Sequence, residues 1–182
     1  MLRITIPGSK ELWDESRQEF IPPSSDRVIQ LEHSLVSLSR WESKWNKCFL
    51  SKREKTTEET IDYIRCMTIT RDVDYDTYYR LSSANIREIN AYIEAPMTAT
   101  YFRDDKIMGH TRETVTSELI YYWMIALNIP FECQKWHLNR LFALIKVCSI
   151  KNNPPKKMSK SEIARQQAEL NAARRKKYHT KG

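Results

Sequence analysis

LEHSLVSLSRWESKWNKCFL, residues Leu31 to Leu50, is the stretch on which the fold depends. Its apolar side chains recur at every third or fourth position, a spacing that places them on one face of an α-helix. They are Leu31, Leu35, Leu38, Trp41 and Trp45. The pattern predicts an amphipathic helix whose apolar face, with two of the five tryptophans, begins a hydrophobic core.

Similar periodicities predict further helices on the C-terminal side of this segment. Thr56 and Glu59 form a capping-box sequence, and we expect a hydroxyl cap at Ser83 and at Thr114 or Thr116. The expected helices are Thr57–Met67, Ala84–Glu94, a segment ending at Asn128, and Glu132–Ile150, with a helical turn at Thr77–Leu81. Trp41 and Trp45, and Tyr121 and Tyr122, are interpreted as core side chains.

The N-terminal residues show β-strand patterns instead. Apolar and polar residues alternate over Leu2–Ile6, and shorter β-favouring runs occupy Gln18–Ile21 and Arg27–Leu31. A second hairpin is expected between Thr98–Phe102 and Lys106–Met108. The predicted fold class is therefore α+β and mainly α: a helical-bundle body with a small N-terminal antiparallel sheet and a basic C-terminal helical tail.

Charge divides the chain into two parts. The length of 182 residues suits one domain with a core of its own, and the net charge is +7. Residues 151–182 hold ten lysines and arginines but two acids, so the tail alone carries +8 and residues 1–150 carry −1. Asn152–Pro155 is a linker sequence, and a capping box at 159–162 precedes a helix expected to end at Lys177. We therefore expect a helical globular domain at 1–150 and a basic linker and helix at 151–182.

No motif for catalysis, cofactor binding or metal binding is present. The three glycines form no phosphate-binding loop, and the four histidines and four cysteines lack metal-ligand spacing. Asp72, Asp74 and Asp76 resemble the start of a calcium loop, but the glycine and glutamate that such a loop needs are missing. Asp104, Asp105 and His110 suit a turn better than an acid–base group. We expect a protein that is not an enzyme and that has no cofactor.

Neither a membrane segment nor a secretion signal is expected. The longest apolar run, Leu119 to Leu127, falls short of the ~20 residues that span a bilayer. The N-terminus lacks the apolar region of a signal peptide. A cytoplasmic location, with no membrane partner, is the resulting expectation.

The basic tail is the candidate site for a partner. Arg174, Arg175, Lys176 and Lys177 are consecutive, and the pair Lys156 and Lys157 precedes them. Such a cluster can neutralise phosphates in a manner blind to sequence. It is equally compatible with an acidic protein surface or with a solvated terminus that aids solubility. The binding of phosphates and these other interpretations all stay open at this point.

Several stretches together carry a resemblance to a known family. They are LEHSLVSLSRWESKWNKCFL at 31–50, TTEETIDYIRCM at 56–67, YIEAPMTATYF at 92–102, TSELIYYWMIALNIPFECQKWHLNRL at 116–141, NPPKKMSKSEI at 153–163 and LNAARRKKYHTKG at 170–182. Together they resemble small proteins encoded in the structural-gene region of long-tailed bacteriophages and prophages, among them tail assembly proteins.

The resemblance implies a role without catalysis. A tail assembly chaperone would bind the tape measure protein and deliver tail tube subunits to it, in the host cytoplasm. The alternative is a minor structural component of the mature virion, in the tail or at the capsid and connector. Its basic arm would then contact neighbouring subunits or packaged DNA. A homo-oligomer is compatible with either role.

Overall fold

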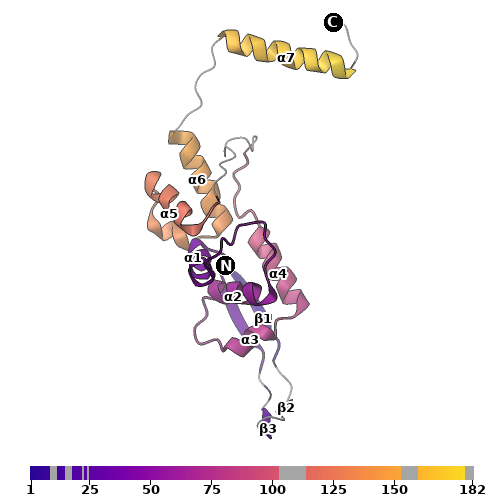
Figure 1. The fold of residues 1–182 in the computed structure, drawn as a ribbon, viewed down its shortest axis with the longest axis vertical. Coiled ribbons are helices and arrows are strands. Elements are labelled where there is room, and N and C mark those ends of the chain that lie inside the picture. Colours follow the sequence, from indigo (N-terminus) through magenta and orange to yellow (C-terminus); the bar gives the residue numbers. More distant parts are fainter. Residues whose placement is uncertain are drawn as a thin grey trace. The chain divides into compact units, whose positions relative to one another are not determined.

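The computed structural model describes residues 1–8, 12–14, 18–21, 23, 25–102, 114–152 and 160–178. It confirms the predicted fold class, mainly helical with small N-terminal antiparallel strand pairs (Figure 1). The chain divides into two compact units, Met1–Ser149 and Ile150–Gly182. The first unit is called the body below.

The N-terminal strands form two separate antiparallel pairs. β1 (Leu2–Ile6) pairs with β4 (Arg27–Leu31), with Leu2 opposite Leu31. β2 (Leu12–Asp14) pairs with β3 (Glu19–Ile21). The alternation predicted for β1 is confirmed, because Ile4 and Ile6 are buried while Arg3 and Thr5 face solvent.

The helix expected from Leu31 to Leu50 is shorter than predicted. α1 spans Leu35–Trp45, and Leu31 belongs instead to β4. Ser34 caps the helix, since its side chain accepts a hydrogen bond from the Ser37 N–H and Ser37 returns the bond. At the other end Asn46 takes the left-handed conformation, with φ 52°, and ends the helix.

Three helices follow α1 in the chain. α2 (Thr57–Met67) has the predicted bounds and the predicted capping box of Thr56 and Glu59. α3 (Tyr75–Tyr79) begins two residues before the expected helical turn. α4 (Ser83–Glu94) is capped by Ser82 rather than by Ser83, because the Ser82 hydroxyl accepts from the Asn85 N–H.

The C-terminal part of the body differs most from expectation. α5 (Ser117–Ala126) is capped by Thr116. The single helix expected from Glu132 to Ile150 is wrong: a 3-10 helix, η2 (Phe131–Lys135), is followed by extended Trp136 and then by α6 (Leu138–Asn152). The expected strand at Thr98–Phe102 is absent from those residues, and Lys106–Met108 lies outside the described residues.

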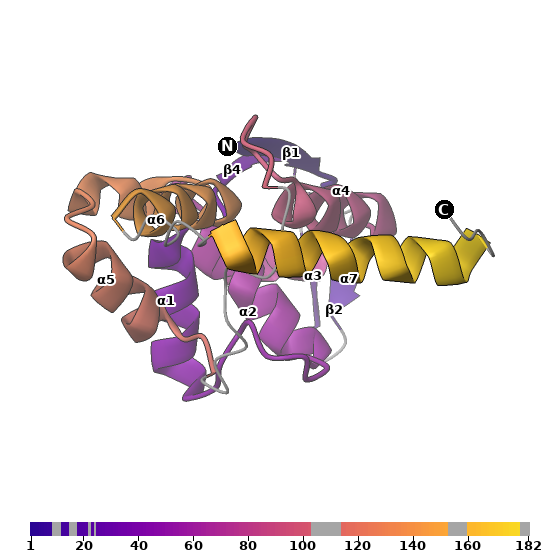
Figure 2. The same cartoon turned by 90° about the horizontal axis from the view of Figure 1, so that it is seen from above.

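Two hydrophobic cores share α1. Trp41 packs in the first core with the β1–β4 pair, α2, α3 and α4. Leu35 and Leu38 pack in the second with α5, η2 and α6. Figure 2 shows α5 on one side of α1 and α2 on the other. The helix predicted to begin one core therefore joins two.

The second unit contains α7 (Lys160–Tyr178). Ser159 of the predicted capping box lies outside the described residues. Every residue of α7 whose burial is described is exposed.

Candidate partner-binding surfaces

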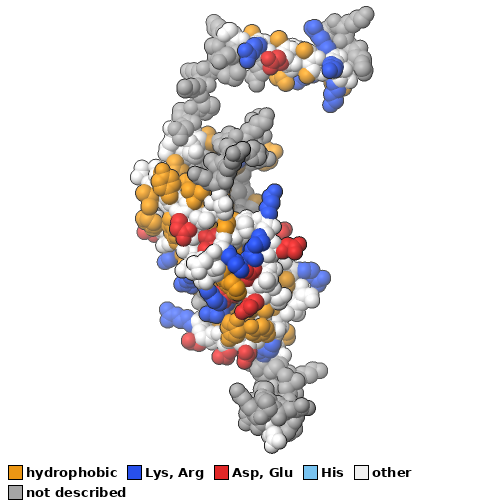
Figure 3. Space-filling view, in the orientation of Figure 1, with side chains coloured by type: hydrophobic (Ala, Val, Ile, Leu, Met, Phe, Trp, Pro, Cys, Tyr) orange, Lys and Arg blue, Asp and Glu red, His pale blue; other side chains and the backbone are white. Residues whose placement is uncertain are grey.

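The predicted basic cluster lies at the C-terminal end of α7. Arg174, Arg175, Lys176 and Lys177 are all helical and exposed, and Figure 3 shows lysine and arginine side chains gathered at that end. Positive charge there also favours the helix itself, because the C-terminal end of a helix carries partial negative charge. Lys156 and Lys157 lie outside the described residues.

The four charges surround the helix instead of forming one face. Successive residues of an α-helix are about 100° apart, so four in a row point to all sides. Glu169, one of the two acids of the tail, lies five residues before Arg174. Arg165 pairs with Glu169 at 3.6 Å. The last turn and a half of α7 is therefore positive all round.

A second candidate surface is an apolar patch on the body. Tyr122 and Ile125 of α5 are 63% and 60% exposed, and Phe131 of η2 is 52% exposed. These three residues are called the α5 face. Figure 3 shows hydrophobic side chains gathered over α5. The expectation that Tyr122 is a core residue is wrong, whereas Tyr121 is partly buried and donates a hydrogen bond to Gln134 Oε1 at 2.9 Å.

The sequence of α5 explains why this patch exists. SELIYYWMIA is apolar on all sides, so burying Ile120 and Met124 in the second core leaves Tyr122 and Ile125 uncovered. In the sequence, the sign of an exposed apolar patch was that the apolar side chains of this helix surround its whole circumference. Periodicity alone does not tell which side of such a helix is covered.

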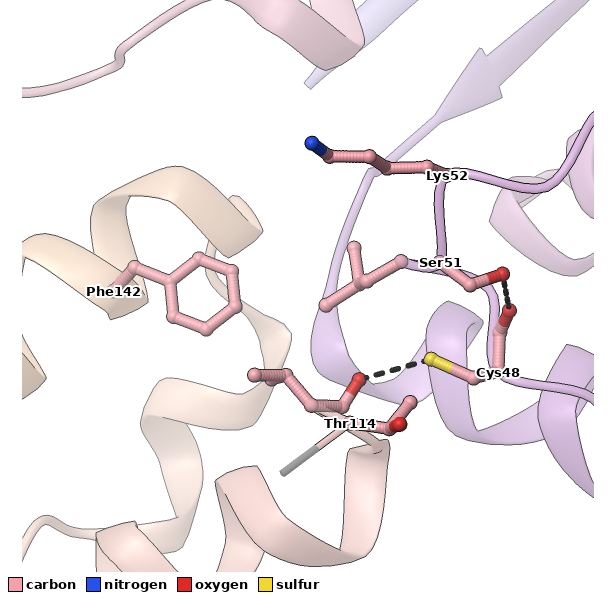
Figure 4. A pocket seen from close by; sticks show the side chains of 7 residues that line it. Cys48, Ser51, Lys52, Thr114 and Phe142 are labelled. Atoms are coloured by element: carbon pink, nitrogen blue, oxygen red, sulfur yellow. Dashed lines mark hydrogen bonds between the residues drawn. The ribbon is translucent and has the colours of Figure 1, made fainter. Parts of the chain in front are cut away.

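An apolar groove of about 530 Å³ lies beside the second core. Leu50, Val115 and Phe142 supply its apolar lining, and Lys52 stands at its edge (Figure 4). The Cys48 thiol donates to the Val115 carbonyl oxygen at 3.1 Å, which joins the two chain segments that form one wall. Three parts of the chain distant in sequence thus meet at the groove.

Buried Glu42 holds α5 in place beside this groove. One carboxylate oxygen accepts from the Phe49 N–H at 2.9 Å, and the other accepts from the Ser117 N–H at 2.7 Å. Ser117 is the first residue of α5, where backbone N–H groups lack helical partners and negative charge is favourable. A carboxylate on α1 therefore fixes the N-terminus of α5.

Two more buried acids anchor α2, Asp62 to α1 and Glu59 to the loop that follows α1. Glu59 accepts from Lys47 and Arg53, and Asp62 accepts from Lys44 and from the Trp45 indole N–H. The hydrogen bond from Lys47, followed by those from the Thr56 N–H and Arg53, lowers the pKa of Glu59 to about 2. Each of these two carboxylates accepts hydrogen bonds from neighbouring side chains, so their role is to stabilise the fold.

A buried histidine pair lies where the two cores meet. His33 and His137 have ring centroids 5.2 Å apart, and the Leu138 N–H donates to the His33 carbonyl oxygen at 2.7 Å. Tyr63 Oη and His33 Nδ1 are 2.6 Å apart, and His137 Nε2 lies 3.0 Å from the Tyr92 carbonyl oxygen. Burial, and then the repulsion that a protonated His137 would exert, lower the pKa of His33 to about 3. Neutral histidines therefore join the two halves of the body.

Metal-binding and membrane-spanning features were also sought in the described residues. Within those ranges no group of three or more His, Cys, Asp or Glu side chains is placed to hold a metal ion. No helix among them combines the length and the apolar character needed to cross a bilayer. Asp104, Asp105 and His110 lie outside the described residues.

No protein-family model matches this chain, and comparisons with curated proteins and with solved structures likewise gave no match.

Proposed function

We propose that this protein is a non-catalytic morphogenesis protein of a long-tailed bacteriophage, resembling tail assembly chaperones. Its body would bind an apolar helix of the tape measure protein. The observation that carries the proposal is the α5 face, where Tyr122, Ile125 and Phe131 are each more than half exposed. An exposed cluster of large apolar side chains on a folded body is typical of a protein-interaction surface.

The form of the α5 face suits a helical partner. Tyr122 and Ile125 are three residues apart, so they project from neighbouring turns of one helix. A second helix can lay its apolar side chains between such ridges. Aromatic residues are enriched at the centres of interfaces, and the face supplies two, Tyr122 and Phe131.

The polar framework beneath the face keeps it in place without a partner. Glu42 fixes the start of α5, and the buried side chains Ile120 and Met124 anchor its inner side. A preformed surface costs less ordering entropy on binding than a surface that must fold first. This favours a protein that captures an extended, helix-forming client.

The test is binding of tape measure segments by variants of the α5 face. The chain is co-expressed with apolar helical segments of a phage tape measure protein, and binding is measured by co-purification and calorimetry. We expect Tyr122→Lys with Ile125→Lys to weaken binding at least about tenfold, because a charged side chain would have to be desolvated at the interface.

A matched control places two lysine substitutions on an exposed pair of residues elsewhere on the body. Tyr75→Lys with Tyr79→Lys alters two exposed residues of α3 and is expected to leave binding unchanged. Equal binding by folded α5-face variants and by the control would contradict the proposal.

The alternative role, a minor component of the virion, is favoured by the exposed basic helix α7, which would contact a neighbouring subunit or packaged DNA. Mass spectrometry of purified mature virions, with the copy number determined, separates the two roles. Absence from the particle together with abundance in the infected cell supports the chaperone. Many copies per particle support the structural component.

A further inference from the structure

We propose that the C-terminal end of α7 is a binding element for duplex DNA that enters the major groove and contacts the phosphates of both strands. The element consists of Arg174, Arg175, Lys176 and Lys177, all exposed. This inference is independent of the α5 face and of the tape measure partner.

The distribution of charge around the helix carries the proposal. Four consecutive bases point to all sides of the helix axis. A flat acidic surface would meet only one side and leave the others unpaired. The major groove of B-form DNA, about 12 Å wide, admits an α-helix and places a phosphate strand on either side of it. Charge on every side of the helix is therefore complementary to a groove.

The composition of α7 also favours nucleic acid over protein. Protein interfaces depend on apolar anchors at their centre, and α7 places Leu170 and Tyr178 eight residues apart with polar residues and alanines between them. Interfaces with DNA are more polar and strongly positive. The described side chains of α7 have the composition of an interface with DNA.

The remainder of the helix can follow the same duplex. From Lys160 to Lys177 the helix axis is about 26 Å long. Gln167, Asn171 and Arg174 share one side of α7 by their spacing of three and four, and Glu169 lies on a different side. Amide and guanidinium groups donate hydrogen bonds to phosphate oxygens. The expected binding is blind to base sequence.

The experiment measures fluorescence anisotropy of the full chain with a labelled B-form duplex of about 16 base pairs, between ~50 and ~200 mM salt. The test variant changes Arg174, Arg175, Lys176 and Lys177 to glutamine, which neutralises the charges but preserves helix propensity. The control variant removes four exposed arginines from the body: Arg3→Gln, Arg40→Gln, Arg71→Gln and Arg87→Gln.

The expected result is a loss of affinity of at least about tenfold at low salt and a decrease in salt slope of about 2 to 4 for the test variant alone. The charge-preserving variant R174K/R175K/K176R/K177R should bind as the wild type does. Equal salt slopes for the test and control variants would overturn the proposal. So would tighter binding to a polyglutamate peptide, or equal binding to duplex RNA, whose narrow major groove excludes a helix.

Discussion

Acidification should destabilise the body by way of the histidine pair. The pKa of His33 falls from 6.5 in the unfolded chain to about 3 in the native protein. Between these values the unfolded chain binds a proton that the native protein does not, so the free energy of unfolding falls as the pH decreases. For His33 alone, moving from pH ~7.5 to pH ~5 costs about 2 kcal/mol. Burial also lowers the pKa of His137, which adds to the loss.

The assay is urea unfolding followed by tryptophan fluorescence at several pH values. The interval between pH ~5 and pH ~7.5 isolates the histidines, because the stability that Glu59 contributes is lost only below its ordinary pKa of 4.5. In the variant His33→Asn the side-chain amide can still form a hydrogen bond with Tyr63 Oη but does not titrate. We expect this variant to lose about 2 kcal/mol less than the wild type over the same interval.

Two results would refute the reasoning. One is a free energy of unfolding that stays constant over this interval. The other is a His33 pKa near 6.5 in the native protein, measured from its ring proton signals by NMR. The second measurement uses the wild-type chain and so does not depend on the folding of any variant.

Three further predictions concern stability. Glu42→Ala leaves the N–H groups of Phe49 and Ser117 without their acceptor and should lower the free energy of unfolding in urea by about 2 to 5 kcal/mol. Glu42→Gln should lower it by about half as much. A loss below about 0.5 kcal/mol in both variants, as small as that of a surface substitution, would contradict the assigned role. Leu38→Ala opens a cavity in the second core and should cost about 3 to 5 kcal/mol, checked by the same assay. Deleting residues 153–182 should change the stability of the body by less than about 0.5 kcal/mol, because the described side chains of α7 are exposed; loss of the cooperative thermal transition would show instead that the tail belongs to the core.

Features set by neighbouring residues were predicted correctly from the sequence. The start of α2 follows from its capping box, in which Thr56 and Glu59 satisfy each other within one turn. Features set by distant residues were not predicted. Leu31 has helical spacing to Leu35, but its backbone pairs with Leu2, and that pairing assigns it to a strand.

The break between η2 and α6 is likewise caused by contacts with residues that are distant in the sequence. Apolar periodicity runs across Trp136 and His137, yet His137 pairs with Ser34 in an isolated bridge and the Leu138 N–H bonds to the carbonyl oxygen of His33. Contacts with the turn before α1 therefore start a new helix there. No local pattern records a contact made across a hundred residues of chain.

One of the two candidate surfaces could be predicted from neighbouring residues, and the other could not. Consecutive charges identify the basic end of α7 without knowledge of the fold, because such residues are seldom buried. The α5 face needed the fold, since Tyr122 and Met124 are both apolar residues of one helix and only packing decides which is covered. The role of Glu42 as an acceptor for two distant N–H groups is invisible in the sequence for the same reason.

The sharing of α1 between two cores gives the molecule an order of assembly during translation. Every buried residue of the first core lies at or before Tyr92, so that core is complete in sequence when α4 leaves the ribosome. At that moment Leu35 and Leu38 lack most of their cover, because the other buried members of the second core begin at Ile120 and only partly buried Phe49 has been synthesised. The nascent chain therefore presents an apolar side of α1 until α5 and α6 have been synthesised, and those two helices complete the body as its last step.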